Sequence, residues 1–228
     1  MSRTYARRKI MALLVSLLVA TWIAAVQFEQ QPAPAVLSSE LQGQYFGEQS
    51  PLEALNSLEV KGRAPKTGYV RAQFGNGWAK DGLCDTRNIV LARDMTNTVV
   101  DDQCRVQKGT LHDPYTGEII QFERGENSNK VQIDHVVALS DAWQKGAQSL
   151  SETERKNLAN DPLNLLAVDG PANQQKGDGD AATWLPPNKA FRCQYVARQV
   201  AVKKKYQLWV TAAEKEVMRR IVAGCASG

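Results

Sequence analysis

The chain has 228 residues, of which 43% are hydrophobic and 23% are charged, and its formal net charge is +4. This composition is typical of a globular protein and excludes a largely disordered chain, while the length suffices for one domain with a sizeable core. The mildly basic balance is compatible with a polyanionic partner, but many proteins without such a partner share it.

Residues 1–36 are expected to lie outside the folded domain. Four basic residues between positions 3 and 9 precede an uncharged, mostly apolar run from 10 to 26, and a Gln/Pro/Ala-rich linker follows. This order is typical of a secretory signal peptide or a membrane anchor. We therefore expect a secreted or membrane-anchored extracellular protein whose N-terminal segment engages the membrane or the export machinery.

Residues 37–68 form a second segment with a weak helical pattern, in which Leu52, Leu55 and Leu58 recur every third position. A stretch rich in Gly, Pro and Lys, residues 61–68, then interrupts the pattern. The folded domain is accordingly expected to span residues 69–228.

The pattern within residues 69–228 predicts a small antiparallel sheet and several helices. Two strands, 106–111 and 118–122, are separated by Asp113-Pro-Tyr-Thr-Gly117, which is strong turn chemistry. Ser151 and Glu154 form one capping box, and Thr211 and Glu214 form another, so a helix is expected to begin at each. Further strands are predicted at 131–137 and 163–168, and further helices at 88–94, 140–148, from 172, and at 188–206.

Four cysteines lie beyond the apolar N-terminal run, where an exported chain meets oxidising conditions and disulfides persist. Three pairings are possible, and we favour Cys84–Cys104 with Cys193–Cys225 because each closes a local segment. A four-thiolate zinc site is the alternative, but it needs closely spaced cysteine pairs, which the sequence lacks.

The stretch 131–140 places Asp134 and His135 side by side in a run of strand-forming residues. Buried polar side chains need a partner or a metal, so this pair is either a structural hydrogen-bonded couple or half of an active site. About thirty residues later, Asn164 lies at the start of a second strand pattern, and Asn173 and Lys176 follow the loop after that strand. The segment 188–220 is also rich in Lys and Arg, so the outer faces of its two helices are candidates for binding a polyanion.

This order of motifs resembles that of the HNH endonucleases, and more narrowly the secreted HNH proteins that share a domain with the C-terminal part of GmrSD-type restriction enzymes. The narrower resemblance rests on Cys84-Asp-Thr-Arg-Asn88, Asp113-Pro-Tyr-Thr-Gly117, Ile133-Asp-His-Val-Val-Ala-Leu139, Asn164-Leu-Leu and Asn173-Gln-Gln-Lys-Gly-Asp178. It covers most of the chain from Tyr69 onward. The resemblance implies an α+β fold: a small antiparallel sheet with a ββα-metal (HNH) finger, and C-terminal helices stapled by a disulfide.

The resemblance also assigns roles to individual residues. His135 matches the general base that activates the attacking water, and Asn164 matches the middle residue, which orients the loop. Asp134 and Asn173 match the metal ligands, and their hard oxygen donors favour a single Mg²⁺ or Mn²⁺ ion. Lys176 and Arg124 are candidates for binding substrate phosphate.

Several of these residues also have structural interpretations. Asn164 could be only a turn residue, Lys176 a solvated lysine, and Arg124 a partner of Glu123 or Glu126. We expect Arg87 to form a structural ion pair and His112 to be exposed and uninvolved.

The sequence therefore predicts an exported, monomeric, metal-dependent HNH nuclease of low sequence specificity, with DNA as the favoured substrate. One alternative is a non-catalytic exported protein of the same fold that binds nucleic acid or the cell envelope. A hydrolase of another class that uses His135 is the other, and no Gly-x-Ser-x-Gly motif supports it.

Overall fold

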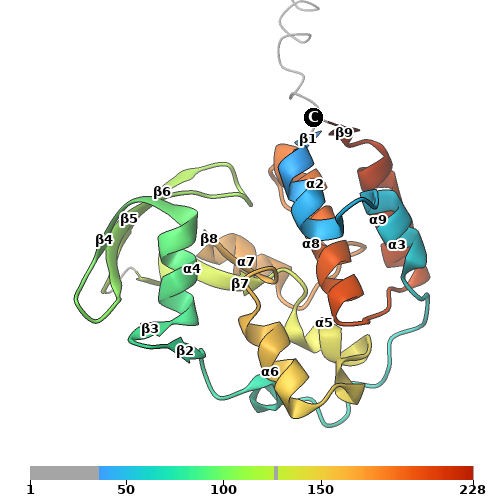
Figure 1. The fold of residues 1–228 in the computed structure, drawn as a ribbon, viewed down its shortest axis with the longest axis horizontal. Helices are drawn as coiled ribbons and strands as arrows, with labels where there is room; N and C mark the ends of the chain where they lie inside the picture. The colour runs from blue at the N-terminus through green and yellow to red at the C-terminus, as the bar shows by residue number, and fades with distance from the viewer. Residues whose placement is uncertain (1–35, 126–127, 228) are drawn as a thin grey trace, which may run out of the picture. The chain divides into compact units, whose positions relative to one another are not determined.

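The computed structural model describes residues 36–125 and 128–227 (Figure 1). The expected signal peptide or anchor falls on residues outside these ranges. Within them, no helix combines the length and the apolar character that a membrane span requires.

Two short helices that precede residue 60 belong to the main core. Helix α2 (Ser39–Phe46) is followed by α3 (Pro51–Ser57), which begins with a capping box between Ser50 and Glu53. Leu55 is fully buried and packs against the C-terminal helices. The folded unit therefore begins earlier than residue 69, because the weak apolar pattern of this segment is completed by residues far along the chain.

A three-stranded antiparallel sheet follows helix α4 (Thr86–Asp94). Strand β5 (Val106–His112) lies between β4 (Met95–Val100) and β6 (Ile119–Glu123). The helix at 88–94 and the hairpin formed by β5 and β6 were predicted from the sequence. Strand β4 was not, since it is largely exposed and its Thr and Asn residues hide the usual alternation.

Both predicted disulfides, Cys84–Cys104 and Cys193–Cys225, are present, and no described cysteine is free. Cys84 opens the short strand β3 (Cys84–Asp85), which pairs with β2 (Lys80–Asp81). Its disulfide joins the start of α4 to the loop between β4 and β5. The expected α+β class with small antiparallel sheets and disulfide-linked helices is thus confirmed.

The C-terminal helices α8 (Arg192–Lys205) and α9 (Ala212–Ala223) supply much of the main core. The capping box predicted at the start of α9 is present between Thr211 and Glu214. Helix α3 contacts both helices (Figure 1). The last described residues form strand β9 (Ala226–Ser227), which is parallel to β1 (Val36–Leu37).

The middle of the chain forms a strand–strand–helix unit. Strand β7 (Val131–His135) pairs antiparallel with β8 (Leu165–Asp169), and α7 (Gly170–Lys176) follows β8 directly. Helices α5 (Leu139–Gln144) and α6 (Glu152–Asn160) lie between the two strands in sequence. Short 3-10 helices occur at Arg71–Phe74, Ser128–Lys130, Ala147–Ser149 and Lys189–Phe191.

The β7–β8 pair is covered on both faces. Leu165 and Ala167 pack with the apolar residues of α4 and the three-stranded sheet, whereas Leu166 and Val168 pack with those of α8. Successive residues of a strand point to opposite faces, so an almost continuous apolar run is what a strand between two cores requires.

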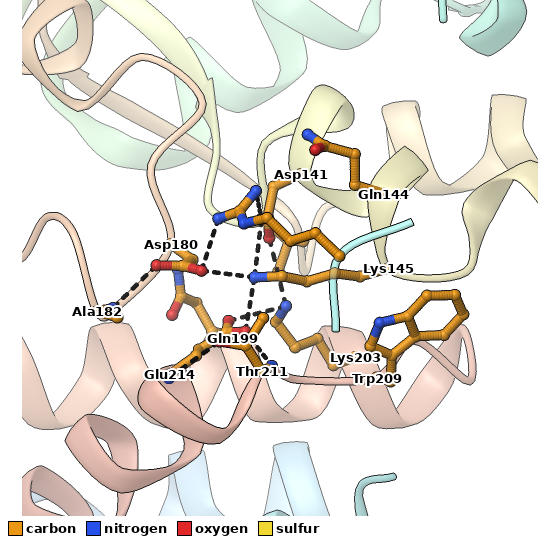
Figure 2. Close-up of polar contacts among 12 residues, drawn as sticks. Asp141, Gln144, Lys145, Asp180, Ala182, Gln199, Lys203, Trp209, Thr211 and Glu214 are labelled. Carbon is orange, nitrogen blue, oxygen red and sulfur yellow. Dashed lines mark hydrogen bonds and ion pairs between the residues drawn. The ribbon is translucent and has the colours of Figure 1, made fainter. Parts of the chain in front are cut away.

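Six ionisable side chains form a network, here called the buried charge network, that joins distant parts of the chain: Arg63, Asp141, Lys145, Asp180, Lys203 and Glu214. All except Arg63, whose side chain is 34% exposed, are buried, and Figure 2 labels these five. Lys145 is completely buried at its centre, and its Nζ lies 2.8 Å from Asp141, 2.7 Å from Asp180 and 2.6 Å from Glu214. Three positive charges thus face three negative ones. This balance is what allows so many charges to leave water.

Candidate active site

Asp134 and His135 are the last two residues of β7, and their side chains point to opposite faces of the strand, as alternation requires. Asp134 lies opposite Leu166 of β8 and His135 lies opposite Leu165. Both nevertheless border one pocket of about 450 Å³, since β7 ends at His135 and the chain then turns away. The structure therefore brings the two residues to the same site.

The carboxylate of Asp134 is 5% exposed and is fully engaged within the protein. One oxygen, Oδ2, accepts a hydrogen bond from the hydroxyl of Tyr115, and the other, Oδ1, lies 2.9 Å from the ammonium of Lys176. Burial, followed by the charge of Asp134, raises the pKa of Tyr115 well above its ordinary value, so the phenol remains a donor.

The imidazole of His135 is buried and held from two sides. Its Nε2 lies 2.9 Å from the carbonyl oxygen of Ala159, and the ring of Trp78 stacks on it with centroids 5.8 Å apart and planes 9° apart. A carbonyl oxygen can only accept, so Nε2 carries the proton and Nδ1 keeps its lone pair. Burial lowers the pKa of His135 to about 3, because the bond to Ala159 only partly offsets it.

Asn164 fixes the turn that follows His135. Its Oδ1 accepts a hydrogen bond of 2.8 Å from the backbone N–H of Val137, and its Nδ2 donates to the carbonyl oxygens of Val137 and Leu158, each at 3.3 Å. The side chain is completely buried. These contacts are of the kind expected for a residue that orients the loop behind the histidine.

Asn173 reaches the same pocket from α7. The helix starts at N-cap Asp169, whose side chain accepts from the N–H of Ala172, and a Cβ at Gly170 would overlap the carbonyl oxygen of Asn129. The Nδ2 of Asn173 donates to Gln132 at 2.8 Å. Its Oδ1 accepts no hydrogen bond from the described part of the chain, so this oxygen is available for a ligand.

The two residues predicted to bind substrate phosphate are occupied elsewhere. Lys176 is 3% exposed, and its Nζ donates to Asp134 and to the carbonyl oxygen of His135, each at 2.9 Å. Arg124 donates to the carbonyl oxygen of Val106 at 2.8 Å and to Asn88 at 2.6 Å. The ammonium of Lys176 is thus paired with a carboxylate inside the protein, whereas the half-buried guanidinium of Arg124 is bonded to neutral acceptors, so phosphate contact by either residue stays a prediction.

Several Lys and Arg side chains of α8 and α9 are also engaged by carbonyl groups or carboxylates of the protein itself. Arg198 donates to three backbone carbonyl groups, and Lys203 belongs to the buried charge network. Lys205 pairs with Asp161, and Arg219 pairs with Glu216. These helices therefore offer less free positive charge than the sequence indicated.

Three residues at the pocket were missed or misassigned by sequence reasoning: Arg71, Trp78 and Arg87. Arg87 makes no ion pair with a carboxylate within residues 36–125 and 128–227; its guanidinium instead donates to the carbonyl oxygen of Val131 at 3.2 Å. An available signal was a tryptophan in the otherwise polar and Gly-rich stretch 75–82, which is unusual for a solvated loop.

The donors at the pocket suit a hard cation better than zinc. No group of three or more His, Cys, Asp or Glu side chains that could hold a metal occurs in the described residues. The carboxylate of Asp134 and the amide oxygen of Asn173 border the pocket, and Mg²⁺ or Mn²⁺ commonly binds through few protein oxygens with water completing the shell. Such an ion would compete with Lys176 for Asp134.

The chain is similar to known proteins over most of its length. Residues 85–221 match the family model described as "GmrSD restriction endonucleases, C-terminal domain". A protein of Arthroderma benhamiae, named "Uncharacterized secreted protein", is 38% identical over 173 residues, which cover 75% of this chain and 82% of the fungal protein. No solved structure matches the chain.

Proposed function

The chain belongs to the family of the C-terminal domain of GmrSD restriction endonucleases, and from this premise we propose that it is an exported, divalent-metal-dependent nuclease that hydrolyses phosphodiester bonds in DNA. The observation that carries the proposal is the unit of β7, β8 and α7, from which Asp134, His135 and Asn173 all border one pocket. Export is supported by the basic and apolar pattern of residues 3–26 and by the name of the fungal relative.

His135 is the general base of this proposal. Its Nε2 proton is directed to the carbonyl oxygen of Ala159, so the lone pair of Nδ1 can accept a proton from water. The lowered pKa keeps the ring neutral at physiological pH. Trp78 holds the plane of the ring, and Asn164 holds the turn behind it.

Asp134 and Asn173 are the proposed metal ligands, through carboxylate and amide oxygens. When bound, a divalent cation at this position supplies charge stabilisation for the leaving oxygen of the phosphodiester. Lys176 and Tyr115 contact its two oxygens and fix the orientation of the carboxylate.

One observation favours the non-catalytic alternative, in which the same fold only binds nucleic acid. Both oxygens of Asp134 already have protein partners, and the ammonium of Lys176 must move away from Oδ1 before a metal can bind that oxygen. The two functions differ in whether added metal produces cutting.

The test uses supercoiled plasmid and the full oxidised chain, with Mg²⁺, Mn²⁺ or EDTA. We expect metal-dependent cutting that falls at least about 100-fold in His135→Gln, because general-base catalysis contributes on that scale. His112→Gln is the matched control, since His112 is the other histidine and lies exposed at the end of β5. Cutting that survives in His135→Gln would place the chemistry elsewhere. Salt-sensitive binding without cutting under either metal would support the binding function.

A further inference from the structure

The pocket beside His135 carries positive charge that the described carboxylates do not neutralise. Arg71 and Arg87 both line it, and neither forms an ion pair with a carboxylate in the part of the chain described here. Asp134 is the acidic residue of the lining, and Lys176 already balances its charge. The pocket as a whole therefore attracts anions.

Arg87 is held at the pocket by the backbone and not by a counter-ion. Its guanidinium donates one hydrogen bond, to the first residue of β7, which leaves further N–H groups without a protein acceptor. Burial and the charge of nearby Arg124 lower its pKa, and Asp85 offsets this only in part. The carboxylate of Asp85 is bound instead to Asn88, at 2.7 Å and 2.9 Å.

Arg71 reaches the pocket from a different element, the 3-10 helix Arg71–Phe74. Its side chain is exposed and makes no described hydrogen bond, so it is free to meet a ligand. Arg71 and His135 line the same pocket. Arg71, Arg87 and His135 thus converge on one pocket from three separate elements.

We propose that Arg71 and Arg87 form the pair that binds the phosphate backbone of the nucleic acid at this pocket. A guanidinium presents several N–H donors in one plane and matches the oxygens of a phosphate, and it stays charged under all physiological conditions. The pair takes the role that the sequence assigned to Lys176 and Arg124. This inference rests on the proposed function for its substrate class, but it concerns binding and not the chemical step.

The test measures binding without cutting. The full oxidised chain, in mild detergent and EDTA, is titrated into a fluorescent DNA duplex at several salt concentrations, and the Kd is compared among wild type, Arg71→Gln, Arg87→Gln and the double variant. Arg220→Gln is the control, because Arg220 is an exposed arginine on α9 whose loss changes the net charge equally. Each pocket variant should weaken the Kd roughly fivefold near physiological salt and reduce the salt slope by about one, whereas the control should match wild type.

The outcomes separate this inference from the proposed function. Wild-type Kd and salt slope in both pocket variants would overturn the arginine pair, even if the protein cuts plasmid. Absence of any DNA binding by wild type at low salt would overturn it as well. Binding that depends on the pair, combined with no cutting under any metal, would support the pair and refute the nuclease. If Arg87→Gln fails to fold, the comparison of Arg71→Gln with wild type still decides the question, because Arg71 is exposed and its replacement should not disturb folding.

Discussion

Replacing Lys145 by methionine would expose how strongly the buried charge network depends on its balance. The ammonium of Lys145 lies within 2.8 Å of carboxylate oxygens from Asp141, Asp180 and Glu214, and the side chain is completely buried. Methionine has a similar length and no charge. The substitution therefore leaves three buried carboxylates with two cations, and water cannot reach them to compensate.

The expected loss of stability is large. Removing one partner of a buried ion pair costs about 3–5 kcal/mol, because the remaining charge stays desolvated. In a domain of this size each kcal/mol lowers the melting temperature by about 2–4 °C. Lys145→Met should therefore melt roughly 6–20 °C below wild type at neutral pH.

Thermal unfolding followed by near-ultraviolet circular dichroism measures this difference. Lys108→Met is the matched control, since Lys108 pairs with Glu123 at 2.9 Å while both side chains remain more than half exposed. A surface pair contributes at most about 1 kcal/mol, so the control should melt within about 4 °C of wild type. Equal melting temperatures for the two lysine variants would refute the reasoning.

A double variant distinguishes charge balance from packing. Adding Glu214→Gln to Lys145→Met leaves two cations and two carboxylates, and glutamine can still complete the capping box with Thr211. The two substitutions should therefore be less destabilising together than the sum of their separate effects. Additive losses would mean that the network is held by packing and that its charges act independently.

Three further outcomes follow from contacts at and around the site. Trp78→Ala removes the ring that stacks on His135, so it should lower kcat with little change in KM, whereas Trp78→Phe should retain most of the wild-type rate. Equal rates in wild type and both variants would show that the stacked ring does not position the imidazole. Burial raises the pKa of Asp180, but the hydrogen bond from Lys145 and the charges of Lys145 and Arg63 outweigh it, so the pKa lies below its ordinary value. The ionised carboxylate therefore stabilises the folded state, and this contribution is complete above about pH 4 and is lost at lower pH. Melting curves recorded down to about pH 2 should show a smaller acid loss in Asp180→Asn, and identical losses would count against this. Replacing Cys193 and Cys225 by serine removes the disulfide between residues 32 positions apart and should lower the free energy of unfolding by about 3.5 kcal/mol. An unchanged melting temperature would contradict this.

The strand–strand–helix unit was predictable because its signals are local. A β-forming run contains Asp134 and His135, a second apolar run follows Asn164, and Asp169-Gly-Pro171 ends that run. The same Asp169 then caps α7, and proline is favoured in the first turn of a helix. Each of these features is decided within a few residues, so the sequence is sufficient to place it.

The electrostatic partners were not predictable, because they are set by contacts between distant residues. The sequence around Lys176 indicates a solvated or phosphate-binding lysine. In the fold, however, β7 places Asp134, which lies 42 residues earlier in the chain, next to its ammonium. Arg71 and Trp78 come to the pocket from a segment with no recognisable motif. Sequence patterns identify which residues carry charge, but the tertiary fold decides which of those charges remain free.

The parallel pairing of Val36–Leu37 with Ala226–Ser227 has a consequence for the order of events during synthesis. The main core draws on α2 and α3 from the early part of the chain and on α8 and α9 from its last forty residues. Contacts between such distant segments must wait until the late residues have left the ribosome. A chain that is still emerging therefore contains β7, β8 and α7 before α8, which covers the face formed by Leu166 and Val168, so this face stays uncovered until α8 has been made.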